Sequence, residues 1–189
     1  MIVKKTNFSG LKIIKGKIFY DSRGFFKEIF KKKLFKNHNP IFWCISKSKK
    51  NVLRGLHLQR KNTQEKFVSV IKGKILDVAV DLRKNSKTFG KHYKVFLSDK
   101  NATSLFIPSG FAHGFLGLEN ENIVMYSNNN YRSKDSETGI MWNDKQLKIN
   151  WPNKKFIISK KDKNNLTLSE FISKNMKLKK KNKKISYAK

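Results

Sequence analysis

The chain has 189 residues, with 43 Lys or Arg against 13 Asp or Glu, so its formal net charge is +30 at pH 7. This length is typical of one domain with a sizeable hydrophobic core. No apolar run is long enough to cross a bilayer, which excludes a membrane partner, and the one cysteine, Cys44, excludes an internal disulfide framework and indicates a cytoplasmic protein.

Short segments rich in β-branched and aromatic residues recur along the chain between polar or glycine-containing turns, and they predict β-strands. In chain order they are GKIFYDS (16–22), FFKEIF (25–30), PIFWCISKS (40–48), KFVSVIKGKILDVAVDL (66–82), KHYKVFLS (91–98), SLFIPSG (104–110), HGFLGLE (113–119) and NIVMYSN (122–128). Within the fourth segment, Lys72-Gly73-Lys74 predicts a hairpin. Many strands without alternating helices predict an all-β fold, namely an antiparallel sandwich, barrel or jelly roll.

Two segments carry further expectations. Alternation in ILDVAVDL (75–82) predicts one buried face and leaves Asp77 and Asp81 to be explained. Helical spacing in TLSEFISKNMKLKK (167–180) predicts a short C-terminal helix with Thr167 or Ser169 as its N-cap. The apolar face of this helix should contain Thr167, Leu168, Phe171, Ile172 and Met176.

The charge allows two interpretations. Lysines in such number could neutralise the phosphates of a nucleic acid, or they could solvate the whole surface. Basic residues are spread along the chain, with one dense run, KLKKKNKK (177–184), and no zinc-finger spacing, RNP-like strand or basic leucine-zipper region is present. We therefore expect no nucleic-acid partner, a domain over residues 1–174, and a basic, flexible tail over 175–189. The charge would still steer small anionic substrates toward the protein.

His57 stands between apolar residues in NVLRGLHLQRKNTQEKFVSV (51–70), where it could be a structural side chain, a metal ligand or a base. A second motif, IPSGFAHGF (107–115), gives Pro-x-Gly-x-x-His. Together they resemble the two motifs of the cupin jelly rolls. Metal-binding cupins need His-x-His in the first motif, and Gln59 occupies the second of these positions here. The usual three N/O ligands cannot be assembled, so we expect no metal site.

Six segments resemble, in order, the nucleotide-sugar epimerase family typified by dTDP-4-dehydrorhamnose 3,5-epimerase, over roughly residues 10–165. They are DSRGFFKEIF, NVLRGLHLQ, EKFVSVIKGKILDVAVDLRKNSKTFGK, IPSGFAHGF, ENIVMYSNNNYRSKDSETGIMWND and INWPNKKFIISKKD. The resemblance implies a cupin-type jelly roll, and a homodimer whose subunits exchange N-terminal strands. It implies cofactor-independent epimerisation at C3 and/or C5 of a nucleoside-diphosphate 4-keto-6-deoxy sugar, as in converting dTDP-4-dehydro-6-deoxy-glucose to dTDP-4-dehydro-rhamnose.

The same resemblance implies the site residues. His57 matches the base and Asp162 the carboxylate that orients it, while Lys66 matches the cation that stabilises the enolate oxygen. Tyr126 matches the acid on the opposite face. The matched substrate-binding positions are Arg23, Phe26, Glu28, Arg54, His113, Glu137 and Lys161. Asp81 could support His113, or Asp77 and Asp81 could each pair with a surface lysine.

Three positions depart from the family pattern and leave the nucleotide and the sugar open. Phe42 and Cys44 replace a Gln-x-Asn that contacts the nucleotide, and Arg132 replaces a second tyrosine at the sugar site. Two alternatives to a 3,5-epimerase therefore stand: a non-catalytic nucleotide-sugar-binding cupin, or an enzyme that epimerises C3 only. Exchange of the C3 and C5 protons separates these alternatives.

Overall fold

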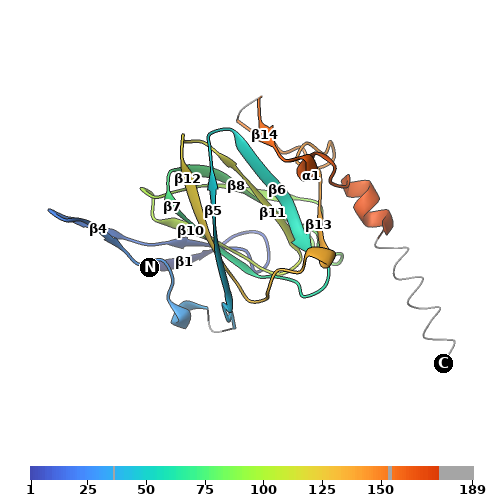
Figure 1. The fold of residues 1–189 in the computed structure, drawn as a ribbon. Helices are drawn as coiled ribbons and strands as arrows, with labels where there is room; N and C mark the ends of the chain where they lie inside the picture. Colours follow the sequence, from blue (N-terminus) through green and yellow to red (C-terminus); the bar gives the residue numbers. More distant parts are fainter. Residues whose placement is uncertain (36, 153–154, 175–189) are drawn as a thin grey trace.

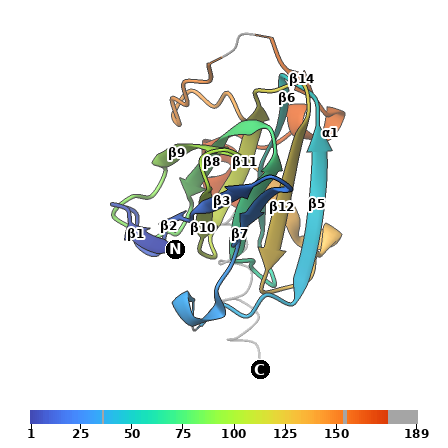
Figure 2. The ribbon, with the colours of Figure 1, turned by 90° about the vertical axis from the view of Figure 1, so that its left-hand side faces the viewer.

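The computed structural model describes residues 1–35, 37–152 and 155–174, and two β-sheets facing each other form its body (Figures 1 and 2). The first sheet has the order β1 (Ile2–Lys5), β2 (Lys12–Lys15), β10 (Thr103–Ile107), β7 (Lys66–Lys72), β12 (Asn122–Asn128) and β5 (Phe42–Ser48). The second has the order β13 (Glu137–Gly139), β6 (Val52–Gln59), β11 (Phe111–Gly117), β8 (Lys74–Asp81) and β9 (His92–Ser98). The prediction of an all-β jelly roll is confirmed.

Shorter elements complete the fold. β14 (Ile157–Ile158) pairs in parallel with β6, and β3 (Ile18–Asp21) and β4 (Gly24–Lys27) form a separate hairpin. The helical elements are η1 (Lys32–Leu34), η2 (Lys134–Ser136), α1 (Lys160–Lys163) and a helix beginning at residue 168 and described to 174. The sequence did not predict β1, β2, β13, β14 or α1, because each spans four residues or fewer and four of them contain charged residues. None of the described helices is long and apolar enough to span a membrane.

Three hydrophobic clusters are present among the described residues, and two of them lie on the two faces of the second sheet. One cluster fills the space between the sheets and includes Val68, Ile75, Ala79 and Phe115. A second cluster lies on the outer face, where Leu76 and Val78 pack against side chains from the segment 140–172. The prediction that β8 has one buried face is therefore wrong. This C-terminal segment covers the face that the alternation would have left in water.

The predicted hairpin at Lys72-Gly73-Lys74 is wrong, because β7 and β8 do not pair and belong to different sheets, so the turn between them links the two sheets. The predicted C-terminal helix is confirmed over its described residues, 168–174. Gly73 joins β7 to β8 with φ +84°, and a Cβ there would overlap the Glu121 carbonyl, so only glycine fits. Thr167, rather than Ser169, caps the helix: its hydroxyl accepts from Glu170 N (3.2 Å) and Glu170 accepts in return from Thr167 N (2.7 Å). Leu168 is buried in the core, whereas Met176 lies outside the described residues.

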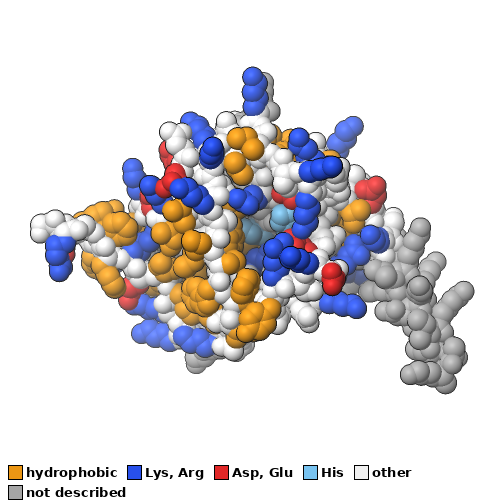
Figure 3. Space-filling view, viewed as in Figure 1, with side chains coloured by type: hydrophobic (Ala, Val, Ile, Leu, Met, Phe, Trp, Pro, Cys, Tyr) orange, Lys and Arg blue, Asp and Glu red, His pale blue; other side chains and the backbone are white. Residues whose placement is uncertain are grey.

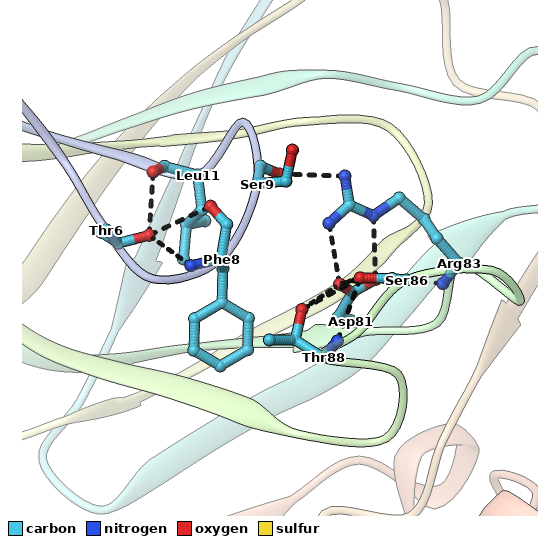
Figure 4. Close-up of polar contacts among 8 residues, drawn as sticks. All are labelled: Thr6, Phe8, Ser9, Leu11, Asp81, Arg83, Ser86 and Thr88. Atoms are coloured by element: carbon cyan, nitrogen blue, oxygen red, sulfur yellow. Dashed lines mark hydrogen bonds and ion pairs between the residues drawn. The ribbon is translucent and has the colours of Figure 1, made fainter.

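A buried carboxylate, Asp81, ties the β1–β2 connection to the barrel (Figure 4). Asp81 accepts from Arg83 Nη2 (2.7 Å), Ser86 Oγ (2.5 Å) and Thr88 Oγ1 (2.6 Å), and Arg83 Nη1 donates to the Ser9 carbonyl (2.9 Å). Burial alone would raise the pKa of Asp81, but these donors lower it from 3.8 to about 2. Asp81 therefore stays ionised at all but very acid pH.

Replacing Asp81 by asparagine should destabilise the fold by about 2–4 kcal/mol at pH 7, because an amide leaves Arg83 without its buried counter-ion. At most about 2 kcal/mol of this destabilisation is linked to the lowered pKa of Asp81, because the Arg83 side chain is 28% exposed and solvent screens the ion pair. Because the pKa of Asp81 is lower in the folded state, its ionised carboxylate stabilises the native state above pH 3.8. This stabilisation is lost as the pH falls through 2. Urea unfolding of both proteins should show their difference shrinking between pH 5 and pH 2; a constant difference would contradict this.

Candidate active site

A cavity of about 700 Å³ lies inside the jelly roll, between the two sheets. Figure 3 shows histidine side chains within a hollow of the surface that has Lys and Arg side chains around it. Eight of the eleven predicted site residues line this cavity: His57, Lys66, Tyr126, Asp162, Arg54, His113, Glu137 and Lys161. The structure thus brings together residues that are up to 108 positions apart, counted from Arg54 to Asp162.

His57 and Asp162 form a hydrogen-bonded pair in the cavity. His57 Nε2 donates to Asp162 Oδ1 at 2.6 Å, and the other carboxylate oxygen accepts from Gly55 N at 3.2 Å. Burial would raise the pKa of Asp162, but the bond from His57 and the nearby charges lower it below its ordinary value. An ionised carboxylate only accepts, so Nε2 carries a proton, and in the neutral imidazole the lone pair lies on Nδ1.

Local structure explains how Asp162 reaches His57. β14 runs parallel to β6, with Ile157 opposite Val52, and leads directly into α1. Ser159 caps α1 by accepting from Asp162 N at 3.1 Å, which fixes the backbone of the carboxylate. The sequence did not predict α1, although a serine three residues before an aspartate is a recognisable N-cap signal.

Gly55 allows the close packing that this site requires. Its φ is +127°, and a Cβ would lie 2.6 Å from Gly114 Cα on the neighbouring strand β11. No other residue type fits without moving the backbone. The glycine two positions before His57 therefore brings β6 against β11 and leaves its N–H available to Asp162.

Lys66 and Tyr126 extend into the same cavity from the first sheet, on β7 and β12. Burial lowers the pKa of the Lys66 ammonium, and the negative charges of Glu137 and Asp77 limit that shift. Burial also raises the pKa of Tyr126, whose hydroxyl shares a 3.1 Å hydrogen bond with Ser46 Oγ. The phenol is therefore fully protonated at neutral pH and can donate.

The carboxylate that holds His113 is Asp77, and the prediction that Asp81 supports His113 is wrong. His113 Nε2 donates to Asp77 Oδ2 at 2.8 Å, and both side chains are buried. The alternative pairing of Asp77 and Asp81 with surface lysines is also wrong, because Asp81 binds Arg83. The His113 ring lies 6.2 Å from the Tyr126 ring, edge to face, so the Asp77–His113 pair packs directly beside the phenol.

Charged side chains lie at both ends of strand β6. Arg54 donates from Nε to Ser48 Oγ and from Nη2 to the Lys47 carbonyl, both at 2.9 Å. Toward the other end, Glu137 pairs with Lys161 at 2.9 Å. The three family departures, Phe42, Cys44 and Arg132, also line the cavity, as does Gln59. Burial raises the pKa of the Cys44 thiol.

Three predicted site residues, Arg23, Phe26 and Glu28, lie outside the cavity within one chain. Arg23 and Phe26 belong to the β3–β4 hairpin region, which projects from the barrel (Figure 1). The Arg23 side chain is 88% exposed and pairs with Asp21, while Glu28 pairs with Lys31. Over the part of the chain that the structure describes, no group of three His, Cys, Asp or Glu side chains could hold a metal ion.

The two facing sheets and the acid–base groups between them define a cupin-type jelly roll with an internal site. The family model for dTDP-4-dehydrorhamnose 3,5-epimerase matches residues 5–170. The chain belongs to this family.

Relatives and solved structures agree with this assignment. The chain is 44% identical over 167 residues to dTDP-4-dehydrorhamnose 3,5-epimerase of Methanothermobacter thermautotrophicus (85% of this chain, 90% of the relative). It is 42% identical to the enzyme of Escherichia coli K12 (91% and 97%). A crystal structure of dTDP-6-deoxy-D-glucose-3,5-epimerase from Legionella pneumophila in complex with dTDP-4-keto-L-rhamnose superposes with a TM-score of 0.86 at 40% identity (89% and 93%).

Proposed function

We propose that this chain epimerises C3 and C5 of dTDP-4-dehydro-6-deoxy-glucose to give dTDP-4-dehydro-rhamnose, without a cofactor. The names of its relatives and the ligand in the Legionella structure support the substrate. The observation that carries the proposal is the His57–Asp162 pair in one cavity with a partly buried lysine and a protonated phenol. These groups are the base, cation and acid that the reaction needs.

The chemistry follows from the acidity of protons next to a ketone. His57 Nδ1 takes the proton from C3 or C5, and the C–H electron pair forms a carbon–carbon double bond while the ketone oxygen becomes an enolate. Lys66 stabilises that oxygen with its positive charge. Tyr126 then gives its hydroxyl proton to the opposite face of the carbon, which inverts the centre and restores the ketone. Asp162 stabilises the imidazolium that forms on His57.

Incubation of the enzyme with the 4-keto sugar nucleotide in deuterated water tests the proposal. Deuterium should appear at both C3 and C5, together with the rhamno-configured product, by NMR. Substrate that returns without deuterium would mean a binding protein, and label at C3 alone would mean a 3-epimerase. Thymidine diphosphate-glucose, which lacks the ketone, is the matched control and should gain no label.

We also propose that the active protein is a homodimer in which the β3–β4 hairpin of each subunit completes the partner's site. Its aromatic side chains are unusually exposed for a soluble chain: Phe19 55%, Tyr20 70%, Phe25 58% and Phe26 65%. Trp43 and Ile45 on the outer face of β5 are 47% and 71% exposed. An exposed apolar area of this kind marks an interface. The dimer would give Arg23 and Phe26 the substrate-binding roles implied by the family.

Mixing two inactive variants should restore activity if the hairpin acts in the partner's site. His57→Ala removes the base of its own cavity, and Arg23→Ala would remove a phosphate contact in the other cavity. A mixed dimer then has one intact site, so re-equilibrated mixtures should recover about a quarter of wild-type activity at low substrate concentration. Sedimentation gives the oligomeric state, and a monomer, or no recovery on mixing, would contradict the proposal.

Two further parts of the proposal concern organisation. We propose a single catalytic domain over residues 1–174 and a basic tail over residues 175–189, which lies outside the described residues. We propose a cytoplasmic location, supported by the single cysteine and by the use of a nucleotide-activated sugar.

A further inference from the structure

A three-residue ion-pair cluster lies at the edge of the cavity. Glu137 Oε2 accepts from Arg132 Nη2 at 2.9 Å and from Arg132 Nε at 3.2 Å, and Lys161 Nζ lies 2.9 Å from Glu137 Oε1. Both oxygens of one carboxylate are therefore occupied by cations of the same chain. The cluster connects the segment after β12 to α1, the helix that carries Asp162.

Gln59 fixes the backbone on both sides of Arg132. Its Oε1 accepts from Ser133 N at 2.7 Å, and its Nε2 donates to the Tyr131 carbonyl at 3.2 Å and to the Asn62 carbonyl at 2.8 Å. Gln59 is only 5% exposed, so these bonds are shielded from water. The position of Arg132 is thus set by a buried amide as well as by Glu137.

The cluster leaves positive charge facing the cavity. The Arg132 and Lys161 side chains are 54% and 52% exposed, whereas Glu137 is 11% exposed. Burial would raise the pKa of Glu137, but the bonds from Lys161 and Arg132 lower it. The cluster therefore has two positive charges and one negative charge, and a net positive charge remains. Four cationic side chains line the cavity, Arg54, Lys66, Arg132 and Lys161, against two acidic ones, Glu137 and Asp162.

We infer that Arg132 is a substrate-binding residue that forms, with Lys161, a site for the diphosphate of the substrate. Glu137 and Gln59 are positioning residues: Glu137 holds the two cations side by side, and Gln59 holds the backbone of Arg132. The planar guanidinium presents several N–H donors, which suit phosphate oxygens. This inference rests on the proposed function for the chemical identity of the substrate.

Calorimetric titration of the full chain with thymidine diphosphate and with thymidine tests the inference. Arg132→Gln should weaken thymidine diphosphate binding roughly 10- to 100-fold, the effect of a charge-assisted hydrogen bond, and leave thymidine binding unchanged. Arg132→Lys should recover part of the loss because it keeps the charge. The matched control is Lys134→Gln, which removes a neighbouring exposed cation that does not line the cavity and should leave both affinities unchanged.

Two results would overturn the inference. One is that Arg132→Gln binds thymidine diphosphate with an affinity within about twofold of wild type. This includes the case where only the KM of the sugar nucleotide rises, which would mean that Arg132 contacts the sugar. The other is an equal loss of thymidine and thymidine diphosphate binding, which would mean a contact with the nucleoside or a distorted cavity. The proposed function is judged separately by deuterium exchange. If the wild-type protein catalyses no deuterium exchange but Arg132→Gln loses affinity for thymidine diphosphate alone, the proposed function is wrong and the diphosphate site stands.

Discussion

Replacing His57 by alanine should lower both deuterium incorporation and epimer formation by at least about 10²- to 10⁴-fold, the contribution of a positioned base. Both readouts fall together because no enolate forms unless a proton leaves the carbon. His57 is the cavity histidine paired with Asp162, whereas His113 is held by Asp77 deeper among buried side chains. Single-turnover measurements in deuterated water give the two rates.

Two further variants make this result specific. Asp162→Asn keeps the imidazole but removes the charge that stabilises its protonated form, so it should give a smaller loss than His57→Ala. His92→Ala changes a histidine on β9 outside the cavity and should leave both rates unchanged. The assignment of the base is wrong if folded His57→Ala, checked by circular dichroism, exchanges protons at a near-normal rate.

The pairing of His113 shows where sequence reasoning reaches its limit. Asp77 and Asp81 are four residues apart on β8, so the strand period puts both on the face that points between the sheets. In the β11–β8 register His113 lies opposite Ala79, midway between the two carboxylates. The alternation therefore could not choose between them. Asp81 is taken by Arg83, Ser86 and Thr88 in the turn after β8, which leaves Asp77 for His113.

The cavity itself shows what a family resemblance adds. Strand periodicity predicts an all-β fold, but nothing local places Asp162 beside His57, 105 residues earlier. That contact depends on β14 pairing with β6, a two-residue strand too short for periodicity to predict. Even the folded single chain does not explain the proposed roles of Arg23 and Phe26, because those roles require a second subunit. From the sequence, Gln59 is recognisable only as the residue that stands at the position of a metal ligand. Its three hydrogen bonds form only when the loops that contain its partners have folded.

Replacing Tyr126 by phenylalanine should separate two rates that fall together in His57→Ala. Epimer formation should drop by about 10²- to 10⁴-fold, because the acid on the opposite face is lost. Deuterium exchange should persist, because His57 and Lys66 still allow the enolate to form. The His57 side chain is 27% exposed, so its proton can exchange with solvent and return as deuterium to the same face.

The control for this variant is Ser46→Ala, which removes the hydroxyl partner of Tyr126 and keeps the phenol. It should change epimer formation by less than about tenfold, because the loss of one neutral hydrogen bond is worth about 1 kcal/mol. Phenylalanine keeps the ring that packs on His113, so the cavity should retain its shape. If exchange in Tyr126→Phe falls as far as epimer formation, the tyrosine takes part in forming the enolate or in holding the substrate. His57 would still be the base, but the opposite-face acid would have to be another cavity residue.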